Sequence, residues 1–145
     1  MSITTKGKNA MKLMLDLGNH AGGEPVKLRD IARRQDISEK YLEQIVSVLN
    51  KAGLVFSIRG AGGGYRLTKR PDEYTVGEII KCVEGNMAVA DCVGNYGNPC
   101  FNKANCVCFL LWEKLDDAMN GVLEEITLAD LLDWQTELLS DQYTI

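Results

Sequence analysis

Apolar residues recur every three or four positions through the first fifty residues, which predicts three amphipathic helices. The first helix begins near Thr4 and ends at Gly18, and the second is a short helix within residues 26–36. The third begins after Ser38, a good N-cap, and ends at Gly53. The short connection between the second and third helices is typical of a helix–turn–helix.

After Gly53 the pattern changes to the alternation that is typical of β-strands. Two predicted strands, Leu54–Ile58 and Tyr65–Thr68, flank a glycine-rich turn at Gly60–Gly64. Three helices followed by such a hairpin predict a winged helix–turn–helix. The absence of side chains in the turn lets its tip approach another surface closely. The turn lacks the GxxxxGKS/T pattern and the following helix of a phosphate-binding loop, so nucleotide binding is a much weaker interpretation.

Three further helices are predicted in the second half of the chain. One spans residues 74–85 and begins with Thr75 and Glu78 spaced as a capping box. A long helix spans residues 109–126, and a last helix runs from residue 127 to residue 139. The fold class is therefore mainly α with a small β-hairpin, a winged helix–turn–helix plus a long helix.

The long helix has an apolar stripe with Trp112 beside it; the stripe consists of Leu111, Leu115, Ala118, Met119 and Val122. A face of this size is too large to leave in water on a monomer, and a two-fold axis lets one patch serve both subunits. We therefore expect a homodimer. The alternative is that the stripe packs within one chain, against the first and last helices.

Charge divides the chain at about residue 70. Residues 1–70 contain 13 Lys and Arg against 6 Asp and Glu, a net of +7, while residues 71–145 contain 3 against 14, a net of −11. Such asymmetry suggests that the basic half meets a polyanion, although two differing solvated surfaces would look the same. We predict a DNA-binding domain at 1–70, with the dimerisation helices and a cysteine loop (about 86–108) at 71–145.

Several classes of protein are disfavoured. The sequence has no run of about 18 apolar residues, which argues against a membrane span, and its N-terminus lacks the apolar core of a secretory signal. A cytoplasmic, reducing location follows as an expectation. The single histidine, His20, and the absence of GxSxG and HExxH motifs argue against an enzyme.

The partner expected for the basic half is double-stranded DNA, because a helix–turn–helix inserts its second helix into the major groove. The residues expected at base edges are Ser38, Glu39, Lys40, Tyr41, Glu43 and Gln44. Gln44 suits adenine, Glu43 can accept from cytosine, and Lys40 suits guanine or phosphate. The predicted phosphate contacts are Arg29, Arg33, Arg34 and Lys51. The predicted wing contacts are Arg59, which suits a narrow minor groove, and the glycines Gly60, Gly62 and Gly63. For any one residue alone, a solvated surface side chain is the simpler interpretation.

The stretch YLEQIVSVLNKAGLVFSIRGAGGGYRL resembles the signature of the IscR/CymR family of bacterial winged-helix transcription regulators. The resemblance extends from ITTKG near the start to ITLADLL near the end. It implies a homodimeric DNA-binding regulator whose dimerisation element is the long helix, here about residues 105–123. It also implies that Glu43, Gln44 and Arg59 match the positions that contact DNA.

Four cysteines lie within seventeen positions, Cys92, Cys100, Cys106 and Cys108, in a segment rich in glycine, asparagine and proline. Thiolates are soft ligands that select iron–sulfur clusters, zinc or copper(I). Cys82 lies among apolar residues of the preceding helix and is expected to be a small buried hydrophobe. The family resemblance implies a [2Fe–2S] cluster held by Cys92, Cys100 and Cys106, because the IscR-like branch has three such cysteines and the CymR-like branch lacks them.

The fourth cluster ligand is the open point. Where the resemblance places a histidine, this chain has Phe109. Cys108 is the nearest substitute; Asp91, Glu113 or a group from the other subunit are the alternatives. On a regular helix Cys106 and Cys108 would point about 200° apart, whereas in an extended turn they would lie on one side. Cys108 as a ligand therefore requires the long helix to begin after it, and an earlier start would turn it toward the core.

Other functions compete with a cluster-sensing regulator. They are a repressor of cysteine metabolism of the CymR type, a zinc site of four thiolates, a thiol switch without metal, and, with least support, a small iron–sulfur electron carrier. An electron carrier does not need a basic helix–turn–helix half, so binding to duplex DNA separates it from the regulators.

Overall fold

The structure is a computed structural model that describes residues 2–94 and 103–143. Its elements in chain order are α1 (Thr5–Asn19), α2 (Leu28–Gln35), α3 (Glu39–Lys51), β1 (Val55–Ile58), β2 (Gly64–Leu67), the 3-10 turn η1 (Pro71–Glu73), α4 (Val76–Glu84), the 3-10 turn η2 (Lys103–Asn105), α5 (Val107–Glu125) and α6 (Leu128–Tyr143). The strands pair antiparallel, with Val55 opposite Leu67 and Ile58 opposite Gly64. None of the described helices is both long enough and apolar enough to cross a membrane.

One hydrophobic core joins the helix–turn–helix, the hairpin and the start of the second half. Leu13 and Met14 on α1 are fully buried in it, as the periodicity predicted. Tyr74, Ile79 and Leu128, which lie beyond residue 70, are fully buried in the same core. The packing therefore crosses the boundary predicted from charge, and the division of function at residue 70 stays a prediction.

Tyr74 fastens the base of the hairpin. Its hydroxyl donates to the Leu54 carbonyl oxygen at 2.6 Å and accepts the Thr68 backbone N–H at 2.9 Å and that of Lys69 at 3.2 Å. A buried tyrosine hydroxyl needs such partners, because an unpaired one costs free energy. The hairpin is thus fixed to the second half of the chain as well as to the helices before it.

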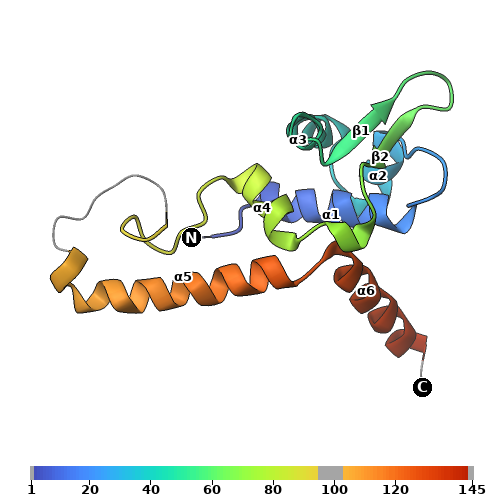
Figure 1. Ribbon diagram of the computed structural model, residues 1–145. Coiled ribbons are helices and arrows are strands. Elements are labelled where there is room, and N and C mark those ends of the chain that lie inside the picture. Colours follow the sequence, from blue (N-terminus) through green and yellow to red (C-terminus); the bar gives the residue numbers. More distant parts are fainter. Residues whose placement is uncertain (1, 95–102, 144–145) are drawn as a thin grey trace.

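A second, smaller core of Ile80, Met87 and Leu123 joins α4 to α5. The two helices approach closely there, since a Cβ atom at Gly77 would lie 2.9 Å from the Leu123 carbonyl oxygen. Beyond this contact α5 runs away from the helix–turn–helix, and α6 leaves the body in another direction (Figure 1). The long helix therefore has one anchored end and one outlying end.

Most of the predicted apolar stripe of α5 is exposed in the single chain. The exposed members are Leu111, Leu115, Ala118 and Val122, whereas Met119 is half-buried against the second core. Packing within one chain therefore accounts for only part of the stripe. On α6, exposed apolar side chains are Trp134, Leu138 and Leu139.

The helix termini agree with the sequence to within a few residues. Thr75 caps α4 by accepting the Glu78 N–H at 3.0 Å, but the capping box is only half formed, because the Glu78 carboxylate pairs with Lys69 at 2.8 Å. The reciprocal box forms instead at α6, between Thr127 and Asp130. The last helix runs to residue 143, beyond the predicted end at residue 139.

Candidate nucleic-acid interface and cysteine loop

The first turns of α3 present polar side chains to solvent. The Ser38 hydroxyl accepts a hydrogen bond from the Tyr41 N–H at 3.1 Å, so the predicted N-cap is confirmed. The opposite face of α3 is buried through Leu42, Ile45, Val46 and Leu49. This burial leaves Glu39, Lys40, Glu43 and Gln44 exposed together, while Tyr41 is half-buried against the core. The exposed set is free to meet a partner, and Tyr41 serves mainly in packing.

The turn before α3 sets the angle between the two helices of the motif. Asp36 ends α2 with φ 54° and ψ 52°, a left-handed conformation that aspartate tolerates better than most residues. The Ile37 N–H then bonds to the Ala32 carbonyl oxygen at 3.0 Å, which closes the turn. This compact connection matches the predicted helix–turn–helix.

The predicted phosphate contacts fall into two groups. Arg29, Arg33 and Lys51 are exposed; Arg33 lies 3.6 Å from Asp30 in a surface pair that is weak in water. Arg34 also has a partner within the fold, because its guanidinium binds the buried carboxylate of Asp16 at 2.8 Å. We therefore assign Arg34 to the joining of α1 and α2, and its contact with phosphate stays a prediction.

The wing places an exposed arginine at the end of β1. Arg59 follows Ile58 and is exposed, with exposed Gly60 and Gly62 beyond it. Gly63 differs from this pattern, because it is buried inside the turn and an added Cβ would collide with the Ile58 carbonyl oxygen. Glycine is required there by the turn itself, so the predicted contact of Gly63 with DNA has a competing structural reason.

The cysteine loop joins α4 to α5, and two of its predicted ligands are half-buried, Cys92 and Cys106. Cys100 lies outside the described residues. Within the described ranges, no three His, Cys, Asp or Glu side chains come together as a metal-binding group. The structure therefore gives the positions of Cys92, Cys106 and Cys108, and the set of cluster ligands stays a prediction.

The start of α5 bears directly on Cys108. The helix begins at Val107, with Cys106 as its N-cap at φ −99° and ψ 109°. Cys108 thus lies in the first helical turn, and the extended arrangement that it needed in order to join Cys106 is not formed. Its side chain is exposed rather than turned toward the core, because the first turn of α5 extends beyond the packed body.

Asp116 anchors the loop to α5 and was missed by the sequence reasoning. Its carboxylate is buried and accepts the Val89 N–H at 3.2 Å and the Asn120 side-chain amide at 3.0 Å. Cys92 follows three residues after Val89, so Asp116 fixes the chain just before the first loop thiol. The available signal was a carboxylate on the same helical face as Met119 and Leu123.

Cys82 behaves as predicted, as a small residue of the core. It is half-buried against the main core, and its Sγ lies 4.0 Å from the Val48 carbonyl oxygen on α3. Burial raises the pKa of its thiol, which disfavours the thiolate form that binds metals.

Comparison with known proteins gives a family match over most of the chain. The model of the Rrf2 family, described as an iron-dependent transcriptional regulator, matches residues 3–134. The HTH-type transcriptional regulator IscR of Aliivibrio salmonicida is 42% identical over 146 residues, covering 100% of this chain and 86% of the relative. The IscR of Serratia proteamaculans is 42% identical over 96% of this chain and 84% of its own length.

Solved structures of similar proteins include both branches named above. The T. potens IscR structure has a TM-score of 0.77 and 41% identity, covering 95% of this chain and 90% of that one. The structure of CymR, the global cysteine regulator of B. subtilis, has a TM-score of 0.76 and 40% identity, covering 92% of this chain and 98% of that one. The similarity to both structures covers the winged helix–turn–helix and the long helix.

Proposed function

Because the chain belongs to the Rrf2 family of transcriptional regulators, we propose that this DNA-binding regulator senses iron–sulfur or redox status through a [2Fe–2S] cluster held by its cysteine loop. The observation that carries the proposal is the set of thiols between α4 and α5, Cys92, Cys100 and Cys106, in a chain whose other half has an exposed recognition helix.

The DNA-binding half of the proposal rests on exposure and charge. Lys40, Glu43 and Gln44 project from the first turns of α3, where a helix–turn–helix meets base edges. Arg59 lies on the wing and suits a narrow minor groove, where negative potential is concentrated. Arg29, Arg33 and Lys51 supply charge for phosphates. Specificity would then come from α3 and the wing, and affinity largely from the phosphate contacts.

The donor set of the loop fits a cluster. Thiolates are the ligands that iron–sulfur clusters prefer, and Cys92 and Cys106 are half-buried free cysteines near the two ends of the loop. A bound cluster would supply a centre whose loss or change of oxidation state alters the loop. Asp116 would transmit such a change, since it joins the loop to α5 through Val89. Because α5 begins at Val107, before Cys108, we expect the fourth ligand to be another group, such as the carboxylate of Asp91 or Glu113 or a group of the second subunit.

The homodimer belongs to the same proposal. The exposed apolar side chains of α5 form a surface that a soluble monomer rarely leaves in water. A second copy covers it with the same surface, as two-fold symmetry requires. Dimerisation would also place two recognition helices for the half-sites of a pseudo-palindrome, about 10 bp apart or a multiple of that.

The decisive experiment is anaerobic purification followed by a visible spectrum with iron and acid-labile sulfide analysis. We expect visible absorption and two iron and two sulfide per chain, as the composition of the proposed cluster requires. The alternatives give other results: zinc at four thiolates, or a dithiol that is oxidised reversibly, leaves the protein colourless. A colourless protein that still binds duplex DNA would favour a response of the kind named for the CymR neighbour, a regulator of cysteine.

A further inference from the structure

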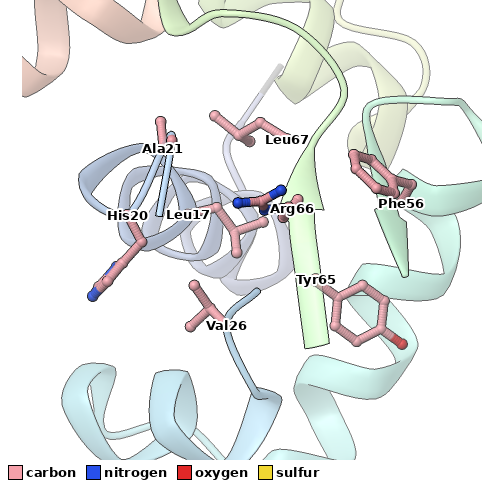
Figure 2. Close-up of a pocket in the computed structure, with 9 residues that line it drawn as sticks. Leu17, His20, Ala21, Val26, Phe56, Tyr65, Arg66 and Leu67 are labelled. Atoms are coloured by element: carbon pink, nitrogen blue, oxygen red, sulfur yellow. The ribbon is translucent and has the colours of Figure 1, made fainter. Parts of the chain in front are cut away.

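A cavity lies between the end of α1 and the face of the hairpin (Figure 2), and none of its lining residues belongs to α3. Its volume is about 290 Å³, at the small end of the range of roughly 300–1,000 Å³ that is usual for ligand clefts. Its lining residues are Leu17 on α1, His20, Ala21, Gly22 and Val26 in and near the loop after α1, Phe56 on β1, and Tyr65, Arg66 and Leu67 on β2.

Arg66 is the charged group at the centre of this cavity. Figure 2 shows its guanidinium in the middle of the lining residues, between Leu17 and Leu67. The residue is half-buried, yet its side chain has no hydrogen bond or ion pair with any described residue. By contrast, Arg34 and Arg70 are paired with carboxylates, and Arg59 is exposed to water. A half-buried arginine without a counter-charge favours an anion at this site.

Apolar side chains form part of the wall around Arg66. Leu17 and Val26 are buried, Leu67 is half-buried, and Phe56 is 39% exposed, so its ring offers apolar surface to a ligand. We infer that the cavity binds a small organic carboxylate with an apolar or aromatic body. The Arg66 fork matches the two oxygens of a carboxylate, and the body is desolvated against Leu17, Val26 and Phe56.

His20 lies at the rim of the cavity and does not compete for the ligand. Its Nδ1 donates to the Asp16 carbonyl oxygen at 2.7 Å, and Figure 2 shows its ring directed away from Arg66. The inner surface therefore has one cation, Arg66, and apolar neighbours. Inorganic phosphate would use the cation but none of the apolar wall, so we expect it to bind more weakly than a carboxylate with an apolar body.

A ligand in this cavity would touch the hairpin and the end of α1 with the loop that leads to α2 at the same time. The two are joined nearby by a short bridge, in which the Val26 N–H donates to the Tyr65 carbonyl oxygen at 3.0 Å and the Tyr65 N–H donates to that of Val26 at 2.8 Å. Arg59 lies on the same hairpin. Resting on the proposed function, we expect occupancy of the cavity to change the placement of the wing and hence the affinity for DNA, and the coupling must be reciprocal.

The binding site is tested with benzoate as the probe, on the full chain labelled with ¹⁵N. We expect benzoate to cause saturable changes in the NMR chemical shifts of backbone amides in β2 and in the loop after α1. Neutral benzamide should cause no saturable change. Arg66→Leu should weaken benzoate at least tenfold, Arg66→Lys should weaken it less, and Arg70→Leu, an exposed arginine elsewhere, should leave it unchanged. No saturation by benzoate, equal binding of benzamide, or an unchanged affinity in Arg66→Leu would each overturn the site. If inorganic phosphate binds as tightly as benzoate, the inference that the ligand has an apolar body is wrong.

The coupling is tested separately, with a duplex selected from a random pool by the wild-type protein. We expect saturating benzoate to change the affinity for this duplex several-fold in the wild type and not in Arg66→Leu. An Arg66→Leu variant that loses DNA affinity without any benzoate effect in the wild type would show that Arg66 contacts a phosphate, and would overturn the coupling. If no duplex is selected at all, the proposed function fails, while the benzoate titration still decides the site.

Discussion

The Asp16 carboxylate on α1 holds the Arg34 guanidinium on α2 through two hydrogen bonds, from Nε to Oδ2 at 3.0 Å and from Nη2 to Oδ1 at 2.8 Å. The Gln35 side-chain amide donates to the same carboxylate at 3.1 Å. The Asp16 side chain is 2% exposed and that of Arg34 is 36% exposed. The first two helices are therefore joined by a buried charge whose partner remains in partial contact with water.

Arg34→Ala should destabilise the fold, because it leaves the buried Asp16 carboxylate without its cation. Removing one partner of a fully buried pair costs about 3–5 kcal/mol, and we expect about 2 kcal/mol here because Arg34 is partly exposed. Urea unfolding of both proteins measures the difference. The matched control is Arg33→Ala, the neighbouring exposed arginine, which should change the unfolding free energy by about 0.5 kcal/mol or less. Equal losses in the two variants would contradict the assignment of Arg34.

Stability should also depend on pH through Asp16. Burial alone acts to raise the pKa of Asp16, but the hydrogen bonds from Arg34 and Gln35 and the charges of Arg34 and His20 together hold it below its ordinary value of 3.8. Its contribution is therefore fully present above pH 3.8 and is lost as pH falls through the lowered pKa. Urea unfolding between about pH 5 and pH 2.5 should show this loss in the wild type. In Asp16→Asn the unfolding free energy should fall less steeply over the same pH range. If the unfolding free energies of the two proteins fall in parallel with pH, the prediction is wrong.

Arg59→Ala should weaken binding to a selected operator by about 1–3 kcal/mol and relax its preference at the positions that face the wing. Fluorescence anisotropy at several salt concentrations measures both affinity and the salt slope. Arg33→Ala should instead weaken all sequences alike and reduce the slope by about one. The control is Arg70→Ala, away from α3 and the wing. Equal affinity of wild type and Arg59→Ala would count against the wing contact.

Leu115→Glu should convert the proposed dimer to a monomer. Leu115 is 45% exposed on the apolar face of α5, and a carboxylate there would be buried against its symmetry mate. Sedimentation velocity at micromolar concentration measures the oligomeric state of the wild type and the variant. Lys114→Glu introduces the same charge at the exposed neighbouring position and should leave the dimer intact. A wild-type chain that sediments as a monomer would refute the dimer itself.

Cys108→Ala should retain iron and the visible spectrum, whereas Cys106→Ala should lose both. The reason is the start of α5 between the two residues, which leaves Cys108 exposed on the first turn and Cys106 half-buried at the N-cap. Cys82→Ala, whose thiol belongs to the core, is the control for the loss of a cysteine that binds no metal. A shifted or weakened spectrum in Cys108→Ala would restore Cys108 as the fourth ligand.

Local rules predicted the helices and the hairpin well, because each depends on neighbouring residues. The Ser38 cap and the helix–turn–helix follow from spacing alone. The end of α6 was placed too early, since Leu139 is the last residue of the apolar pattern but propagation of a helix needs no apolar residue beyond it.

Contacts between residues far apart in the sequence were not predicted, because local rules use only neighbouring residues. The pairing of Arg34 with Asp16 was not predicted, because Asp16 is 18 residues away and on another helix. A charge at Asp16, next to Leu17 in a buried helix, was the signal for such a pair. The cavity at Arg66 had no signal in the sequence, because its walls come from four separate segments.

The close approach of Gly77 to Leu123 holds α5 near its C-terminal end, so a rotation of the helix about Leu123 moves its two ends by different amounts. Sixteen residues separate Leu123 from Val107, so the outer arm is about 24 Å long at 1.5 Å per residue. A tilt of one degree about Leu123 displaces Val107 by about 0.4 Å, because displacement grows with the length of the arm. The inner arm, from residue 123 to residue 125, moves by less than a tenth of an ångström per degree, about an eighth as far. Small rotations at the packed end are thus magnified at the end where Cys106 lies.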